Sequence, residues 1–328
     1  MLGRLDGGRL LAAPDDGACD ASHAEAKAGF SLDPLMPDAI ALAAEEVGVK
    51  KAKLRPWVLF TLAMLGGAFV ALGGLFATVT IAGAAGQLPY GVTRLLMGAT
   101  FSLGLMLVVI AGAQLFTSDA LMVMAWASGR LDTGRMLCVW GIVWLGNFTG
   151  ALGVAALAFL SGQYAFGHGE VGVSVLYLAA AKSTLAPGQA FFLGILCNVL
   201  VCLAAWVAMA ARSITDKILA MFFPVTAFVA AGFEHCVANM YFIPSGLFIK
   251  WWAPLSFWDE LASRGIAPPD IPLDQFAINM VAVTLGNWVG GAVLVGAVYW
   301  AIFRSGRTGH AHPDLQLRLG GDTGRRAY

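Results

Sequence analysis

The chain has 328 residues, of which 59% are hydrophobic and only 12% are charged, whereas soluble domains carry about 25% charged residues. A mean hydropathy of +0.75 argues against a soluble globular protein and indicates a polytopic membrane protein. Twenty basic and twenty acidic residues cancel, so the net charge gives no support for a nucleic-acid partner.

The N-terminal region divides into two predicted parts. Residues 1–33 are rich in small residues and lack the apolar core of a signal peptide, so we expect a flexible tail. Residues 34–56 are predicted to form an amphipathic cytoplasmic helix that leads into the membrane domain, with Pro37 and Asp38 in its first turn. A polar face that is simply solvated explains the same pattern.

Six apolar runs follow, and together they define a transmembrane domain over residues 57–304, after which residues 305–328 form a cytoplasmic tail. A spanning helix needs about 20 residues. The second and fifth runs are too long for one straight crossing, so we expect them to be broken or strongly tilted. The runs cover residues 57–81, 93–128, 136–160, 188–211, 217–249 and 275–303.

Basic residues orient these six runs. By the positive-inside rule both chain ends face the cytoplasm, and the loops near 82–92, 161–187 and 250–274 face outward. Lys182 lies in an outward loop, against this trend. The basic residues on the predicted cytoplasmic side are Lys50, Lys51, Lys53, Arg55, Arg130, Arg135, Arg212, Lys217, Arg304 and Arg307.

The two halves of the chain repeat a motif. LGNFTG at 145–150 matches LGNWVG at 285–290, and three crossings separate them, so the halves are expected to lie inverted in the membrane. Each half also has its overlong run in the corresponding place, with GAQLFTSD at 112–119 and GFEH at 232–235 between two prolines. Interrupted segments at matching positions of inverted repeats indicate a midplane transport site.

The interrupted segments carry the polar groups of the apolar runs. Thr117, Ser118 and Asp119 are expected to cap a second half-helix, whose free N–H groups would attract an anion. His235 is an ionisable residue inside a membrane segment and is therefore a functional candidate. Kinked helices that serve packing alone are the structural alternative.

At these residues the chain resembles the formate/nitrite transporter family, and most closely its formate-channel branch, over residues 34–304. The resemblance implies an aquaporin-like, all-α protomer with six transmembrane helices, two of them broken, assembled as a homopentamer in a bacterial inner membrane. It is carried by PLMPDAI, FSLGLML, GAQLFTS, ASGR, ILCNVLVCLA, RSITDK, GFEHCVANM and LGNWVGG.

The resemblance also implies a channel or transporter for small monovalent anions that needs no cofactor or metal and contacts lipid. Formate is the expected substrate; nitrite, hydrosulfide or a short carboxylate is the alternative. The implied positions are His235, Thr117, Asn198 and Asn287 at the pore centre, Phe101, Phe228, Leu105, Leu115 and Val201 at the constrictions, and Lys182 for anion attraction.

A buried histidine suggests how an anion would cross an apolar slit. A carboxylate sheds its water there only at a cost of several kcal/mol, whereas the neutral acid does not. An imidazolium at His235 could therefore protonate the permeant, and the sequence leaves passive flow and proton-coupled transport equally open.

An intramembrane enzyme is the competing class. A pair of His235 with Ser118 or Ser245 would be its catalytic centre, but the chain has no GxSxG or HExxH motif. We therefore expect no enzymatic activity. Gln114 departs from the family pattern, because it replaces a usual acidic residue. Glu234 is left out of the predicted pore set, and the sequence leaves open whether it contacts the path or holds a loop backbone.

Overall fold

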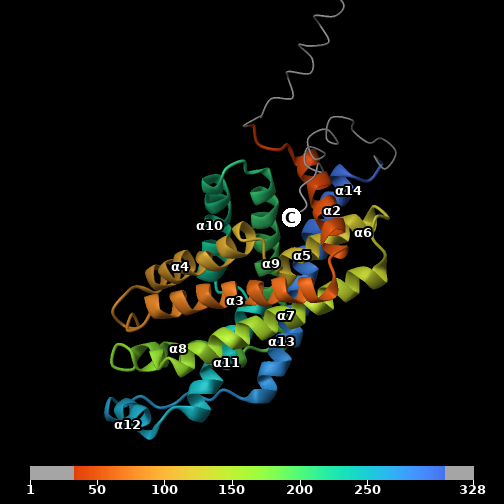
Figure 1. The fold of residues 1–328 in the computed structure, drawn as a ribbon. Helices are drawn as coiled ribbons and strands as arrows, with labels where there is room; N and C mark the ends of the chain where they lie inside the picture. The colour runs from red at the N-terminus through yellow and green to blue at the C-terminus, as the bar shows by residue number, and fades with distance from the viewer. Residues whose placement is uncertain (1–32, 307–328) are drawn as a thin grey trace, which may run out of the picture. The chain divides into compact units, whose positions relative to one another are not determined.

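The computed structural model describes residues 33–306, and every regular element in that range is a helix (Figure 1). The predicted tails, 1–33 and 305–328, lie outside the described residues except at their inner ends. Five helical stretches are long and apolar enough to cross a membrane. They are α3 (Pro56–Thr80), α4 (Tyr90–Ile110), α7 (Thr133–Leu160), α9 (Pro187–Ala210), and α13 (Leu273–Trp288), which continues through the π-helical η3 (Val289–Ala297) into α14 (Val298–Phe303).

Two crossings are broken. After α4, the chain turns and resumes as α5 (Phe116–Asp119), η1 (Ala120–Met122) and α6 (Val123–Ala127). The other broken crossing consists of α10 (Ile214–Ala230) and α11 (Cys236–Trp252). The prediction of an all-α membrane protomer with six crossings, two of them interrupted, is therefore confirmed.

The interruptions share one local geometry. Gly112 and Gly232 each have a positive φ, of 79° and 78°, which an L-residue with a side chain adopts at a steric cost. The next residue of each segment closes the turn: the Ala113 N–H donates to Val108 O at 2.9 Å, and the Phe233 N–H donates to Phe228 O at 3.0 Å. The segment at 112–116 therefore corresponds position by position to that at 232–236.

Prolines 224 and 244 do not break the fifth run, although the sequence suggested interruptions there. Both lie inside continuous helices, in α10 and α11 respectively. Neighbouring helices can stabilise a membrane helix that contains a proline. The glycine turn at 231–235 alone interrupts this crossing.

The LGNxxG motifs bring the long helices of each repeat together. A Cβ atom on Gly150 of α7 would lie 1.9 Å from the carbonyl oxygen of Met64 in α3, and one on Gly290 would lie 2.2 Å from that of Ile195 in α9. Only glycine permits these approaches. The repeats therefore pack alike, with α3 against α7 and α9 against α13 (Figure 1).

The N-terminal helix α2 (Pro37–Ala52) packs beside α6 and α14 (Figure 1). Its buried face includes Glu45, whose side chain is fully buried. The Glu45 carboxylate accepts from the Arg304 Nε at 2.8 Å and from the Arg130 Nη1 at 3.3 Å. One carboxylate therefore links α2 to the loop after α6 and to the end of the last crossing.

Two helices occur in loops where the sequence predicted none. They are α8 (Glu170–Ser183), preceded by η2 (Gln163–Ala165), and α12 (Leu255–Ser263). Both pack on α11 through a separate apolar cluster that includes Leu176, Leu247 and Leu261. Neither is long enough to span a membrane, so hydropathy did not distinguish them from loops.

Candidate permeation site

The backbone of each interruption is held by an asparagine from an LGNxxG motif. Asn147 Oδ1 accepts from the Phe116 N–H at 2.9 Å, and its Nδ2 donates to Gln114 O at 2.9 Å. Asn287 makes the corresponding pair with the Cys236 N–H at 2.8 Å and Glu234 O at 2.9 Å. These amides satisfy buried backbone groups that would otherwise be unpaired.

The predicted caps of the first interruption are therefore wrong. Thr117 and Ser118 lie inside α5, and the Ser118 hydroxyl donates back to Leu115 O at 3.1 Å. Asn147 supplies the capping oxygen from a distant helix instead, because its side chain reaches the first free N–H of α5.

The two interruptions meet at one side-chain contact. Thr117 Oγ1 lies 3.1 Å from His235 Nε2, and both residues are buried. Thr117 belongs to the first repeat and His235 to the second, where it forms the N-cap of α11. The structure therefore places these two predicted central residues together.

The partner of the other ring nitrogen assigns the tautomer of His235. Nδ1 accepts from the Ala238 N–H at 3.2 Å, as an N-cap does. An accepting Nδ1 carries no hydrogen, so the proton of the neutral ring is on Nε2, which donates to Thr117 Oγ1. The Thr117 hydroxyl hydrogen then remains available for another acceptor.

Aromatic rings surround the histidine on one side. The Phe228 ring stacks on the imidazole with centroids 5.8 Å apart, and it meets Phe101 edge to face at 5.9 Å. Phe242, which sequence reasoning missed, stacks on Phe101 at 6.2 Å. The predicted pairing of Phe101 with Phe228 is thus seen as a contact, and Phe242 extends it.

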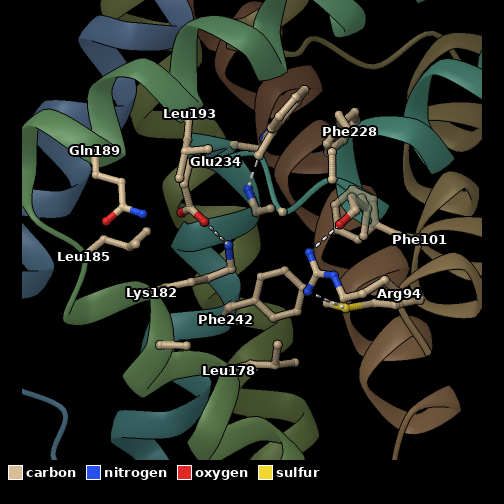
Figure 2. Close-up of a pocket in the computed structure, with 18 of the residues that line it drawn as sticks. Arg94, Phe101, Leu178, Lys182, Leu185, Gln189, Leu193, Phe228, Glu234 and Phe242 are labelled. Carbon is tan, nitrogen blue, oxygen red and sulfur yellow. Dashed lines mark hydrogen bonds and ion pairs between the residues drawn. The ribbon is translucent and has the colours of Figure 1, made fainter. Parts of the chain in front are cut away.

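An open cavity of about 330 Å³ lies beyond these rings, and we call it the α8 vestibule. Its wall includes His235 and Lys182. Lys182 Nζ is 2.8 Å from Glu234 Oε1 (Figure 2). Asn239 Nδ2 donates to Glu234 Oε2 at 2.7 Å. Glu234, which the sequence left open as a pore residue, itself lines this vestibule and is paired there with Lys182.

A second cavity of about 290 Å³ lies against α2, and we call it the α2 vestibule. Its wall includes Gln114, Ser118 and Asp119, and Lys51 of α2 forms an ion pair with Asp119. Because Ser118 lines this cavity while His235 lines the other, the Thr117–His235 contact lies between the two vestibules.

Other predicted site residues are buried near the interruptions but line neither vestibule. Asn198 donates to Thr117 O at 3.1 Å and to Asn287 O at 2.6 Å. Both asparagines therefore bind backbone, and the geometry gives them a positioning role. Leu105, Leu115 and Val201 are at most 5% exposed, and Leu115 precedes α5.

Several polar residues of the site were missed from the sequence. Arg94 lies two residues beyond the predicted outward loop at 82–92, and it lines the α8 vestibule. Asn147 was quoted only as part of a repeat motif. The positive-inside rule singled out Lys182 as a basic residue on the predicted outer side. Applied to Arg94, next to the outward loop at 82–92, the same rule would also have found it.

Comparisons with known proteins agree with this geometry. The sequence model described as "Formate/nitrite transporter" matches residues 38–301. The Formate channel FocA of Escherichia coli strain K12 is 42% identical over 278 residues, which are 84% of this chain and 97% of that protein. The FocA protein of Haemophilus influenzae is 41% identical over 254 residues, 77% of this chain and 89% of that protein.

Solved structures show the same fold. A "pentameric formate channel with formate bound" superposes with a TM-score of 0.71 at 40% identity, covering 76% of this chain and 97% of that one. An "FNT family ion channel" superposes with a TM-score of 0.69 at 31% identity, covering 80% and 98%. The match to transport proteins also confirms the prediction that this chain is not an enzyme.

The family match and the membrane crossings cover nearly the same residues. The matched range, 38–301, includes both interruptions and both LGNxxG motifs. The chain is an integral membrane protein and belongs to the formate/nitrite transporter family.

Proposed function

We propose that the chain conducts small monovalent anions across a membrane, with formate as its main substrate and a path through both vestibules. The observation that carries this proposal is the buried contact between Thr117 and His235, flanked by Phe101 and Phe228. The formate channels among its relatives and the formate-bound structural neighbour support the choice of formate over nitrite.

The chemistry of the site suits a small carboxylate. Aromatic rings exclude a hydrated ion, so the permeant loses water beside Phe228 and needs replacement hydrogen bonds. The Thr117 hydroxyl and the His235 Nε2–H are donors at that point. A formate oxygen can accept a hydrogen bond from either donor.

Proton transfer from His235 requires the imidazolium form. In that form Nδ1 carries a hydrogen and must release the Ala238 N–H. The Nε2 proton would then pass to a formate oxygen, formic acid would leave, and a proton from water would restore the imidazolium. We propose that proton transfer to formate occurs only when the His235 ring releases the Ala238 N–H. While that contact is intact, the neutral ring only donates a hydrogen bond to the anion, which then passes without a proton.

We also propose a homopentamer whose chain ends face the cytoplasm of a bacterium, in its inner membrane. The structural neighbour described as pentameric supports the assembly. Lys51 belongs to α2, and Arg130, Arg135 and Arg304 contact this helix. This cluster of basic residues supports a cytoplasmic position for the α2 vestibule.

Stopped-flow uptake into proteoliposomes tests this proposal. Formate and nitrite fluxes are compared over a pH series for the native protein and for His235→Asn, which retains a polar side chain. We expect formate flux to exceed nitrite flux in the native protein, and the variant to lose most of the flux and its pH dependence.

Each alternative gives a different result. A nitrite flux equal to or above that of formate would contradict the substrate assignment. A variant with native flux and native pH dependence would reduce His235 to a helix cap. Vesicles that remain impermeable to both anions would contradict the transport function as a whole.

A further inference from the structure

We infer that Arg94 supplies the net positive charge of the α8 vestibule and is the group on which an incoming anion first docks. This inference rests on the proposed function and adds a docking site to it. Lys182, the basic residue expected to attract anions, has its charge balanced within the same wall.

Lys182 forms a largely buried ion pair with the Glu234 carboxylate. Its Nζ lies 2.8 Å from Glu234 Oε1, and the two side chains are only 14% and 5% exposed. The pair sums to zero formal charge. Because opposite charges at this distance cancel one another's field over longer distances, the pair attracts a distant anion only weakly.

Arg94 has neutral partners instead. Its guanidinium donates to the carbonyl oxygens of Val229 and Ala230, at the end of α10, and lies 3.8 Å from the sulfur of Met97 (Figure 2). Among residues 33–306, no carboxylate lies within ion-pair distance of it. Its unit charge therefore remains uncompensated.

The guanidinium also has donors to spare. Three of its nitrogens make the contacts described, one each, and a guanidinium carries five N–H groups. Its planar fork matches the two oxygens of a carboxylate. Arg94 is half-buried in the vestibule wall, so an anion bound there keeps part of its water.

Position along α4 connects this site to the aromatic constriction. Phe101 follows Arg94 by seven residues on the same helix, which is about two turns, or roughly 10 Å along the axis. Residues seven apart share one helix face. An anion docked on Arg94 is therefore about two helical turns from the Phe101 ring.

The experiment measures the half-saturating formate concentration for uptake by the full-length protein in proteoliposomes, at about 10 mM and about 500 mM background salt. We expect Arg94→Gln to raise this concentration about fivefold at low salt, because an uncompensated charge acts on the anion, and to have little effect at high salt. Arg94→Lys keeps the charge and should stay near the native value.

Arg264→Gln is the matched control. Arg264 is ion-paired with Glu170 at the start of α8 and does not line the vestibule. The Arg264→Gln variant removes one positive charge, as Arg94→Gln does, and should leave the half-saturating formate concentration unchanged. An equal shift in this control, or no shift in Arg94→Gln, would overturn the inference.

Arg94 also donates to the carbonyl oxygens at the end of α10, so Arg94→Gln removes a structural contact as well as a charge. A second variant changes the charge of the vestibule and leaves this contact intact. Gln189→Glu adds a negative charge to the same exposed wall, and we expect the same salt-dependent rise. A native response to Gln189→Glu would count against the inference. Formate flux through the native protein supports the proposed function whatever the variants show. The docking inference can therefore be wrong while the proposed function stands.

Discussion

At the scale of single residues, the hydrogen-bond pattern separates groups that would touch the proposed path from groups that hold its walls. Thr117 and His235 meet between the vestibules. The side-chain amides of Asn198 and Asn287 hydrogen-bond to backbone carbonyls and to a backbone N–H. Sequence reasoning predicted all four as neighbours of the path, but it could not tell these roles apart because it gives no side-chain direction.

Replacement of Thr117 tests the contact without altering side-chain shape. Thr117→Val removes the hydroxyl and should lower formate flux about tenfold, which corresponds to the loss of one hydrogen bond of about 1.4 kcal/mol. Stopped-flow uptake measures the change. Thr117→Ser keeps the hydroxyl and should retain most of the flux, and a valine variant with native flux would show that the hydroxyl does not bind the permeant.

At the scale of elements, hydropathy and repeats predicted the crossings well. The runs at 57–81 and 188–211 agree with α3 and α9 to within one residue at each end. The breaks fell where GAQLF and GFEH were noted. Helices α8 and α12 were missed because short, partly polar helices give no hydropathy signal, and their stability depends on tertiary packing.

The two interruptions also differ in the placement of their charge. Position 114 corresponds to 234, and 119 corresponds to 239. Glu234 pairs with Lys182 and accepts from Asn239, whereas Asp119 pairs with Lys51 and Gln114 lines the same vestibule. The acid and the amide are thus exchanged between the repeats. The negative charge that the family pattern places at position 114 is carried by Asp119, five residues later.

Exchanging the acid at position 119 with the amide at position 114 should restore the stability that is lost when the acid alone is removed. Asp119→Asn alone leaves the largely buried Lys51 ammonium without its carboxylate and should cost about 2 kcal/mol of unfolding free energy. Adding Gln114→Glu restores a carboxylate in the arrangement of the other repeat and should recover most of the loss. Unfolding by SDS titration in mixed micelles measures both.

The matched control is Gln114→Glu alone. It adds a second buried acid beside Asp119 and should destabilise the fold rather than stabilise it. If the double variant is no more stable than Asp119→Asn, Lys51 cannot use a carboxylate at position 114, and the correspondence between the repeats does not extend to their charges.

At the scale of the whole molecule, one buried carboxylate joins regions far apart in sequence. Glu45 binds Arg304 and Arg130, and its Oε1 also accepts from the Ser128 hydroxyl. Trp300 Nε1 donates to that hydroxyl at 2.8 Å. The N-terminal helix is thereby fixed to the end of the last crossing and to the loop after α6.

Loss of this carboxylate should loosen α2. Glu45→Ala leaves two arginines without their partner, and we expect a loss of about 3–5 kcal/mol of unfolding free energy, together with faster amide hydrogen exchange in α2. Exchange mass spectrometry and SDS titration measure these effects. Glu46→Ala is the control: this neighbour is not fully buried and should change little. Unchanged exchange in Glu45→Ala would show that apolar packing alone holds α2.

The correspondence between the interruptions also bears on how the central site arose. Leu115 occupies the position equivalent to His235, and Val237 the position equivalent to Thr117. Two identical copies of the first half would place a threonine against a leucine at this contact, and two copies of the second would place a valine against a histidine. The hydrogen bond at the centre therefore requires that the two halves differ in sequence at these positions, so the symmetry that places the two segments together cannot by itself supply the pair.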